Sequence, residues 1–209
     1  MKKSILFAAM AAMFLCSCGT TQKVNQSKGL GEEIAKSPAQ MYAEDPSATT
    51  LRAWAKYQGL QSQPIEQLAA AQARGELATS IAALVKTAIK TYAGQYGKEQ
   101  LSAEQVEKIM SADNKAEQSL EQLANELVQY APAKVTNSYR QSDGTVIAYV
   151  CVELHPTNIL NAVKKNKEYQ DVVNANQKMQ IDFASEKFDE SMKSSFDELQ
   201  QKKEDEKKR

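Results

Sequence analysis

Cysteine and histidine carry the most versatile chemistry in proteins, and both are scarce here. The 209 residues contain three cysteines and one histidine, His155. A zinc site needs several histidine or cysteine ligands at defined spacings, and a Ser-His-Asp relay needs a nucleophile on a glycine-rich elbow, which the sequence lacks. There is no phosphate loop or dinucleotide fingerprint, and the scattered acidic residues suggest no catalytic carboxylate pair. We therefore predict that the protein is not an enzyme and uses no metal or cofactor, with His155 ending a strand before Pro156.

The spacing of residues before Cys18 gives the strongest chemical signal. Two lysines are followed by an apolar run over 5–15 and then by Leu15-Cys16-Ser17-Cys18. A basic start, an apolar stretch and small residues before a cleavage point define a secretory signal, and the run is shorter than the about 20 residues of a stable membrane span. The tetrapeptide resembles the lipobox of bacterial lipoproteins. That resemblance implies a signal peptide over 1–17 and acylation of Cys18; the alternative is an ordinary secretory signal containing two cysteines.

The residue after the acylated cysteine bears on which membrane holds the chain. Gly19 stands where many inner-membrane lipoproteins of some bacteria show aspartate, so the resemblance favours the outer membrane, with the domain facing the periplasm. The 26 basic and 26 acidic residues balance, and loss of Lys2 and Lys3 leaves a net charge of about minus two. Such a chain has no overall attraction to nucleic acid. The predicted membrane contact is therefore the N-terminal lipid.

Cys151 is the one cysteine outside the N-terminal segment, so an intramolecular disulfide is not expected in the mature chain. It lies in the apolar run 146–152, and no histidine or lysine flanks it to lower its pKa. We interpret it as a small buried hydrophobe. The alternative is a reactive or intermolecular thiol.

Hydrophobic periodicity predicts an α+β domain over 49–156 behind a polar tether over 18–48. Leu51, Ala53, Ala55 and Tyr57 share one parity, which predicts a first strand ending near Gly59. Helical spacing then runs over 64–96, with Gly75 as either a close approach or a tolerated defect, and again over 102–128 as one interrupted helix or two short ones.

Two more strands follow Pro132. Asp143-Gly144 between extended runs is a strong hairpin signal, and it predicts strands over 134–140 and 145–154. The second of these is apolar on both parities as far as Glu153, which is typical of a central strand. We therefore expect a small antiparallel sheet of three strands packed by long helices. Before the second helical stretch, Ser102 and Gln105 have the spacing of a capping box.

A long amphipathic helix is predicted over 157–209, where charged residues line one side. Its apolar side is a candidate interaction surface, because a helix of this length outruns a small sheet. The residues of this side are Phe188, Met192, Phe196 and Leu199.

The order of these elements carries a family resemblance. At Ala69-x-x-x-Ala73-Arg74-x-x-Leu77-Ala78, followed by Asp143-Gly144-Thr145 and Tyr149, the chain resembles the Lpp-twenty lipoprotein family and is similar to the N-terminal domain of the flagellar assembly T protein. The match covers roughly 50–156. It departs from the family in a later hairpin tyrosine, an enlarged insert over 98–130 and the C-terminal helix. The resemblance implies an envelope lipoprotein with a small α+β fold and no catalytic residues.

Two functions fit these observations. The first is a lipid-anchored envelope protein with a structural or protein-interaction role, whose partner is another envelope protein or a second copy. The alternative is a periplasmic module that binds a small molecule or glycan, for which Trp54, Tyr57 and Tyr92 are the candidate groove. A cavity of several hundred cubic ångströms near Trp54 would favour the second.

Overall fold

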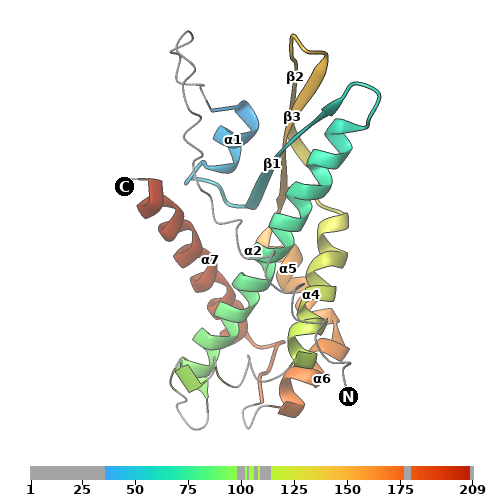
Figure 1. The fold of residues 1–209 in the computed structure, drawn as a ribbon. Helices are drawn as coiled ribbons and strands as arrows, with labels where there is room; N and C mark the ends of the chain where they lie inside the picture. The colour runs from blue at the N-terminus through green and yellow to red at the C-terminus, as the bar shows by residue number, and fades with distance from the viewer. Residues whose placement is uncertain are drawn as a thin grey trace, which may run out of the picture. The chain divides into compact units, whose positions relative to one another are not determined.

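A three-stranded antiparallel sheet organises one end of the domain. The computed structural model describes residues 36–97, 102, 104–105, 108, 114–176 and 180–207. Its strands are β1 (Leu51–Leu60), β2 (Ala133–Arg140) and β3 (Thr145–Leu154), in the order β1-β3-β2 (Figure 1). The predicted first strand, hairpin and central strand are all confirmed. The predicted α+β class with three antiparallel strands is therefore correct.

The hairpin between β2 and β3 closes on a turn whose residues suit it chemically. Gly144 has φ 84°, a left-handed conformation that glycine adopts without steric cost. The Asp143 carboxylate accepts a hydrogen bond of 2.9 Å from the Thr145 amide. These local contacts fix the β2–β3 register, in which Tyr139 lies opposite Ile147.

One face of the sheet is covered by the long helix α2 (Ile65–Tyr96). Because side chains alternate along β1 and β3, the apolar ones point toward this helix. The first half of α2 carries small residues on the side that faces them, which allows the helix and the sheet to pack closely. We call this the inner face. Its buried side chains from the strands are Leu51, Ala53, Ala55, Ala148, Val150, Val152 and Leu154.

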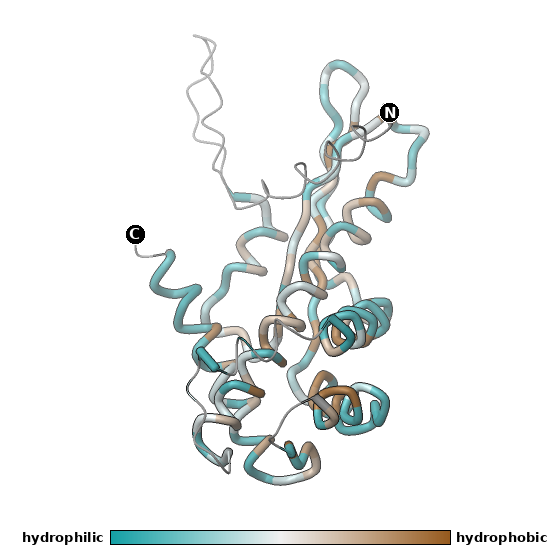
Figure 2. Tube along the Cα trace, turned by 60° about the horizontal axis from the view of Figure 1, so that its bottom comes forward, coloured by the Kyte–Doolittle hydropathy of each residue, from teal (hydrophilic) through white to brown (hydrophobic). Residues whose placement is uncertain are grey.

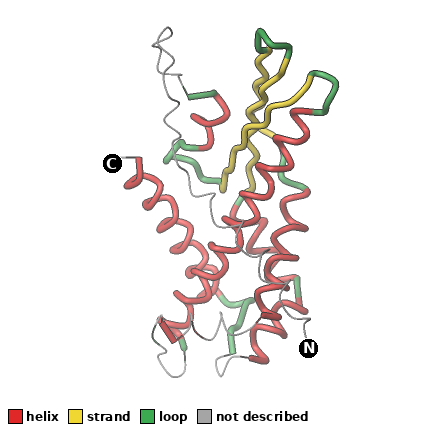
Figure 3. The backbone as a smooth tube through the Cα atoms, viewed as in Figure 1, coloured by secondary structure: helices red, strands yellow, loops and turns green. Residues whose placement is uncertain are grey.

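The second half of α2 runs beyond the sheet into a helical layer (Figures 1 and 3). Helices α4 (Asn114–Gln129) and α7 (Glu186–Lys207) pack on it directly. Helices α5 (Pro156–Lys165) and α6 (Lys167–Asn176) complete the layer by packing on α4, and α5 also meets α7. One continuous core therefore joins the inner face to the helices. The predicted capping box is also present, because Ser102 and Gln105 exchange backbone-to-side-chain hydrogen bonds of 2.8 and 3.2 Å.

The prediction of a single helix over 157–209 is corrected to three helices. Asn166 separates the first two, since its side chain accepts a hydrogen bond of 2.9 Å from the Tyr169 amide in the manner of an N-cap. Asn174 then bonds both backbone groups of Ile181, and the Ser185 hydroxyl caps the start of α7. The long C-terminal helix is α7, with 22 residues, and its last turns are hydrophilic (Figure 2).

The predicted polar tether over 18–48 is also corrected at its C-terminal end. Helix α1 (Pro38–Ala43) lies within it, on the opposite face of the sheet from α2. Ser37 caps this helix through its hydroxyl, which accepts from the Gln40 amide at 3.2 Å, and Pro38 occupies the first turn. Serine followed by proline is a recognisable helix start that periodicity alone misses, because the helix has only six residues. Residues 1–35 lie outside the described part.

Gly75 gives a direct test of the local packing of α2. A β-carbon built at this exposed helical position meets nothing within 4 Å, so the glycine is a tolerated defect rather than a close approach. We predict that Gly75→Ala raises the free energy of unfolding by about 0.5–1 kcal/mol. The control is Gly144→Ala, which we expect to destabilise by about 1 kcal/mol because of its positive φ. Thermal melting of both variants checks this, and a destabilised Gly75→Ala would reveal a contact that the geometry lacks.

Candidate functional site

The described residues contain no cluster of side chains that could hold a metal ion. No group of three or more histidine, cysteine, aspartate or glutamate side chains converges anywhere in the described ranges. His155 is exposed at the end of β3, where its Nδ1 accepts a hydrogen bond of 3.2 Å from the Thr157 amide and so caps α5. Its environment is that of a structural residue.

Within the part of the chain that the structure describes, no helix is both long enough and apolar enough to cross a bilayer. The predicted lipidation site, Cys18, lies outside the described residues. It remains a prediction from the sequence.

The three aromatic residues predicted to line one groove are not brought together. Trp54 lies on the face of the sheet away from α2, whereas Tyr57 packs on the inner face. Tyr92 is buried in the helical layer, with its ring centroid 6.1 Å from that of Phe188. The predicted groove is therefore wrong. Alternation along β1 puts Trp54 and Tyr57 on opposite faces of the sheet, and Tyr92 lies near the C-terminal end of α2.

The four residues predicted as an interaction surface on α7 are turned into the fold. Phe188 and Met192 are buried, and Phe196 and Leu199 are partly buried against the same core. Phe188 meets Phe183 at a centroid distance of 4.9 Å with an edge-to-face geometry. This prediction is corrected because α2 extends beyond the sheet and supplies the apolar surface that α7 needs. The helix is core, so its apolar side is not available to a partner.

Exposed apolar side chains of the strands indicate a different candidate surface. It is the face of the sheet opposite to α2, which we call the outer face. Alternation places Trp54 and Lys56 of β1 there, and their neighbours on β3 and β2 follow by register. Helix α1 covers only the end of this face nearest Glu153. We call the remainder the open half, and its residues are Lys56, Gln58, Leu60, Asn137, Tyr139, Ile147 and Tyr149.

Aromatic rings form a continuous row across the outer face. Trp54 stacks against Tyr149 at a centroid distance of 6.4 Å, and Tyr139 meets Tyr149 edge-on at 6.0 Å. Tyr139 on β2 keeps 46% of its surface exposed and Leu60 on β1 keeps 61%, so large apolar side chains meet water at both edge strands of this face. The row therefore ends in water on the β2 side.

The strands carry an excess of positive charge. Arg52, Lys56, Lys134 and Arg140 are their cations, and Glu153 is their single carboxylate. Glu153 pairs with Arg52 and Lys134, at 3.3 and 3.1 Å. The contacts of the other two cations are with neutral groups: Lys56 lies 5.8 Å above the Tyr149 ring, and Arg140 hydrogen-bonds the Gln61 amide. By register Arg140 lies opposite Val146, on the inner-face parity, so the open half is aromatic with Lys56 as its cation.

One polar atom of the open half has no partner. The Asn137 side-chain oxygen is buried and makes no hydrogen bond within the structure. Buried acceptors are nearly always satisfied, because leaving one unpaired costs about 1–3 kcal/mol. Since Asn137 lies opposite Tyr149 in the register, this unsatisfied acceptor sits within the aromatic row.

A polar cluster closes the other end of the outer face. Glu153 accepts hydrogen bonds from the Tyr42 hydroxyl at 2.8 Å and from Thr50 at 3.1 Å, besides its two cationic neighbours. Burial opposes ionisation of this carboxyl, but the hydrogen bonds from Tyr42, Lys134 and Thr50 outweigh it and hold its pKa below the ordinary value. The cluster joins α1 to β1, β2 and β3.

Cys151 is buried beneath α1, as predicted for a small hydrophobe. Burial raises the pKa of its thiol to about 11, which keeps it protonated at neutral pH. The interpretation as an inert thiol is favoured over the reactive one.

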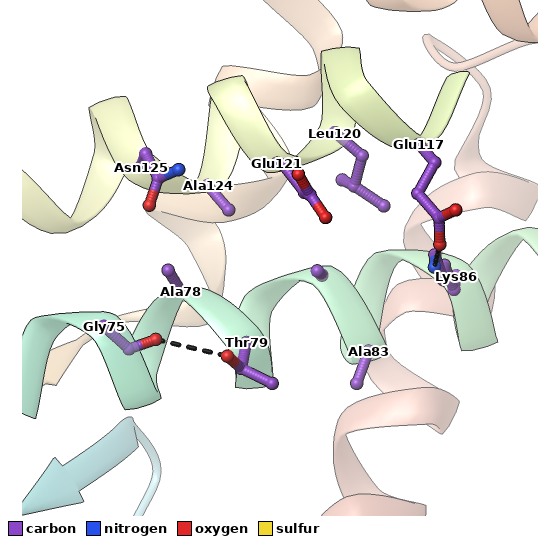
Figure 4. Close-up of a pocket in the computed structure, with 11 residues that line it drawn as sticks. Gly75, Ala78, Thr79, Ala83, Lys86, Glu117, Leu120, Glu121, Ala124 and Asn125 are labelled. Atoms are coloured by element: carbon purple, nitrogen blue, oxygen red, sulfur yellow. Dashed lines mark hydrogen bonds and ion pairs between the residues drawn. The ribbon is translucent and has the colours of Figure 1, made fainter. Parts of the chain in front are cut away.

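A groove lies between α2 and α4 (Figure 4). It is a groove of about 420 Å³ with a floor of small residues such as Gly75, Ala78 and Ala124. The Lys86–Glu117 ion pair bridges the helices at one end. The groove lies between two helices rather than beside Trp54 on the sheet, and its charged lining residues are the Lys86–Glu117 pair and Glu121.

Comparison with known proteins adds no relative: no family model, no curated protein and no solved structure matches the chain. The resemblance to the Lpp-twenty family stays a prediction carried by its residues.

The burial of α7 predicts a large stability effect. We expect Phe188→Ala to lower the free energy of unfolding by about 3–5 kcal/mol, because it removes a fully buried aromatic ring. Leu199→Ala is the matched control on the same helix, and its partial burial predicts a clearly smaller loss. Chemical denaturation measures both free energies of unfolding. If neither variant lost stability, the apolar side of α7 would not be part of the core.

The environment of Glu153 predicts a specific acid sensitivity. Its folded-state pKa lies below the ordinary value of 4.5, so its contribution to stability is present above pH 4.5 and is lost as the pH falls through the folded pKa. We expect Glu153→Gln to cost about 1–3 kcal/mol at pH 7 and the gap to the wild type to narrow in the acid range. Denaturation curves between pH 7 and pH 3 test this; a gap independent of pH would contradict it.

Proposed function

We propose that this chain is a lipid-anchored, non-enzymatic envelope protein whose domain binds an acidic segment of a protein partner through the open half of the outer sheet face. Cys18 is the proposed anchor, on the strength of the lipobox-like residues before it. The outer membrane is the proposed location, with the domain facing the periplasm. The observation that carries the binding role is the aromatic row beside Lys56, which ends in the exposed ring of Tyr139.

The chemistry of the open half supports a protein segment as the occupant. Tyrosine side chains offer large, stiff contact area with a polar end, and they are enriched where proteins bind one another. Lys56, the cation of the open half, has a neutral aromatic neighbour, so a partner carboxylate would gain a charge-assisted hydrogen bond there. The partner is therefore expected to be acidic.

The edge position of β2 favours the same kind of partner. β2 is the last strand of the sheet, and most of its residues are exposed on both faces. A partner segment lying against Tyr139 would thus reach the open half without displacing any described helix. Lys134 and Arg140 near its two ends also discourage pairing of two copies through this edge, since antiparallel pairing would bring like charges together.

A glycan remains the second candidate. It is supported by the aromatic row together with the unpaired Asn137 oxygen, which a sugar hydroxyl could satisfy. The charge of Lys56 plays no part in binding a neutral glycan, and this separates the two candidates experimentally.

The proposal predicts a site-specific crosslink in living cells. We expect a photoreactive residue at position 139 of the full chain to crosslink one protein, with the linked partner peptide rich in acidic residues. Lys56→Glu should reduce this crosslink roughly tenfold, because it places like charges together. Lys193→Glu, on the exposed side of α7, should leave it unchanged.

Tyr130 supplies the positional control, since it is 83% exposed but lies at the end of α4 rather than on the sheet. A photoreactive residue there should give no comparable product. Equal products at 130 and 139 would refute the protein-binding role. The glycan candidate predicts that the protein is retained on immobilised envelope glycan. If the Lys56→Glu variant is still retained and the Tyr139→Ala variant is not, this second candidate is favoured.

A further inference from the structure

The covered half of the outer face already holds one occupant, helix α1. Its apolar side is small: Ala39 and Ala43 are buried, whereas Met41 between them is 54% exposed. These two alanines pack on Cys151, with Trp54, Val135 and Tyr149 around them. The result is an apolar seat on the sheet that a narrow helix fits.

The seat is separate from the rest of the core. The side chains between α1 and the sheet form their own cluster, apart from the continuous core that joins the inner face to the helical layer. The substantial contacts of α1 are with the three strands (Figure 1). Removing α1 therefore leaves the inner face and the helices with all their buried partners.

The helix has little stability of its own. A six-residue helix is far shorter than the about 12–15 residues at which isolated helices become marginally stable in water. Two alanines and the half-buried ring of Tyr42 are its only apolar contacts in this cluster, so the apolar contribution to docking is modest. What holds α1 in place must therefore include its polar contacts.

Those polar contacts converge on Tyr42. Its hydroxyl donates to Glu153 at 2.8 Å, and its backbone carbonyl accepts from Arg52 at 2.9 Å. The Arg52 guanidinium also lies 3.7 Å from the centroid of the Tyr42 ring. One residue of α1 thus makes a hydrogen bond, a charged contact and a cation–π contact with the sheet, and we call this set the Tyr42 clasp.

We propose that α1 is a displaceable strap and that its seat is a docking site for a helical segment of a protein partner with the same chemistry, two small residues four apart and a tyrosine between them. The occupant is defined by what sits there now: alanine, then tyrosine three residues on, then alanine. This inference does not depend on whether the open half binds anything. It adds a second surface, next to the first, that opens when α1 leaves.

The strap sits where the chain enters the domain. The predicted tether from Cys18 leads directly into α1, and only residues 44–50 connect α1 to β1. The tethered helix has a high effective concentration at its seat, so a partner competes only when the Tyr42 clasp is weakened or the partner is abundant. Displacement is thus a competition between two similar helices for one seat.

Cys151 reports whether the seat is occupied. It is fully buried under α1, and its raised pKa further slows reaction with thiol reagents. In the full chain, mass spectrometry of the peptide containing Cys151 separates its labelling from that of the N-terminal cysteines. We expect the wild type to label at least a hundredfold more slowly than the unfolded chain.

Ala39→Glu is the variant that should empty the seat, because it forces a charge into a fully buried position. We expect Cys151 labelling to rise toward the unfolded rate while thermal melting stays cooperative. Ala71→Glu, at an exposed position of α2, is the matched control and should change neither. Tyr42→Phe, a milder change, should speed labelling about tenfold by removing the hydrogen bond to Glu153.

A synthetic fluorescent peptide of residues 36–48 is the probe for the docking site. It should bind the Ala39→Glu chain, raise the fluorescence anisotropy and slow Cys151 labelling again, and a peptide with glutamate at position 39 should do neither. Slow labelling in both Ala39→Glu and Tyr42→Phe would overturn the proposal, since α1 would then not be displaceable. Loss of cooperative melting in Ala39→Glu, or no binding of the peptide to the emptied seat, would overturn it as well.

Discussion

The length of α2 relative to the strands is the constraint on which the rest of this structure depends. Its 32 residues extend over about 48 Å, whereas a strand of 10 residues extends over about 33 Å. The sheet buries the first half of the helix and leaves the second half with apolar residues on a wide stripe. That second half, from Ile81 to Ala93, has to be covered by something else. Helices α4 and α7 provide the cover, and α5 and α6 then complete the layer.

The packing of the long helices explains why the two faces of the sheet differ in burial. The long helices pack mainly on the inner face and on the projecting half of α2, so the main described helix on the outer face is α1, with six residues. The outer face therefore keeps large apolar side chains partly in contact with water, with Tyr139 and Leu60 the most exposed. Cross-strand ring contacts stabilise the part that α1 leaves open, and the Glu153 cluster holds the end that α1 covers. The outer face is thus the face of the sheet that the helices leave partly uncovered.

Sequence patterns located the elements well and the surfaces poorly. The strand at 51–60, the hairpin at Asp143-Gly144 and the Ser102 capping box follow from residues that contact one another within a few positions, and all three are confirmed. The helix breaks at Asn166 and Ser185 were missed although each carries a capping side chain, because long apolar spacing was given more weight than single polar residues. Helix α1 was missed for the same reason. Capping residues were the signal that would have found these boundaries.

The sequence by itself determined the class of the domain, the order of its strands along the chain, the central place of β3 and the burial of Cys151, because alternation and turn chemistry act over short distances. It also supplied the lipobox-like residues before Cys18. Only the tertiary structure decided what each apolar stripe faces. Phe188 and its neighbours on α7 form a stripe whether a core or a partner covers it, and the position of α2 made it core. Trp54 and Tyr57 are three residues apart in the chain yet lie on opposite faces of the sheet, so the aromatic row with Tyr149 and Tyr139 exists only once the strands are paired.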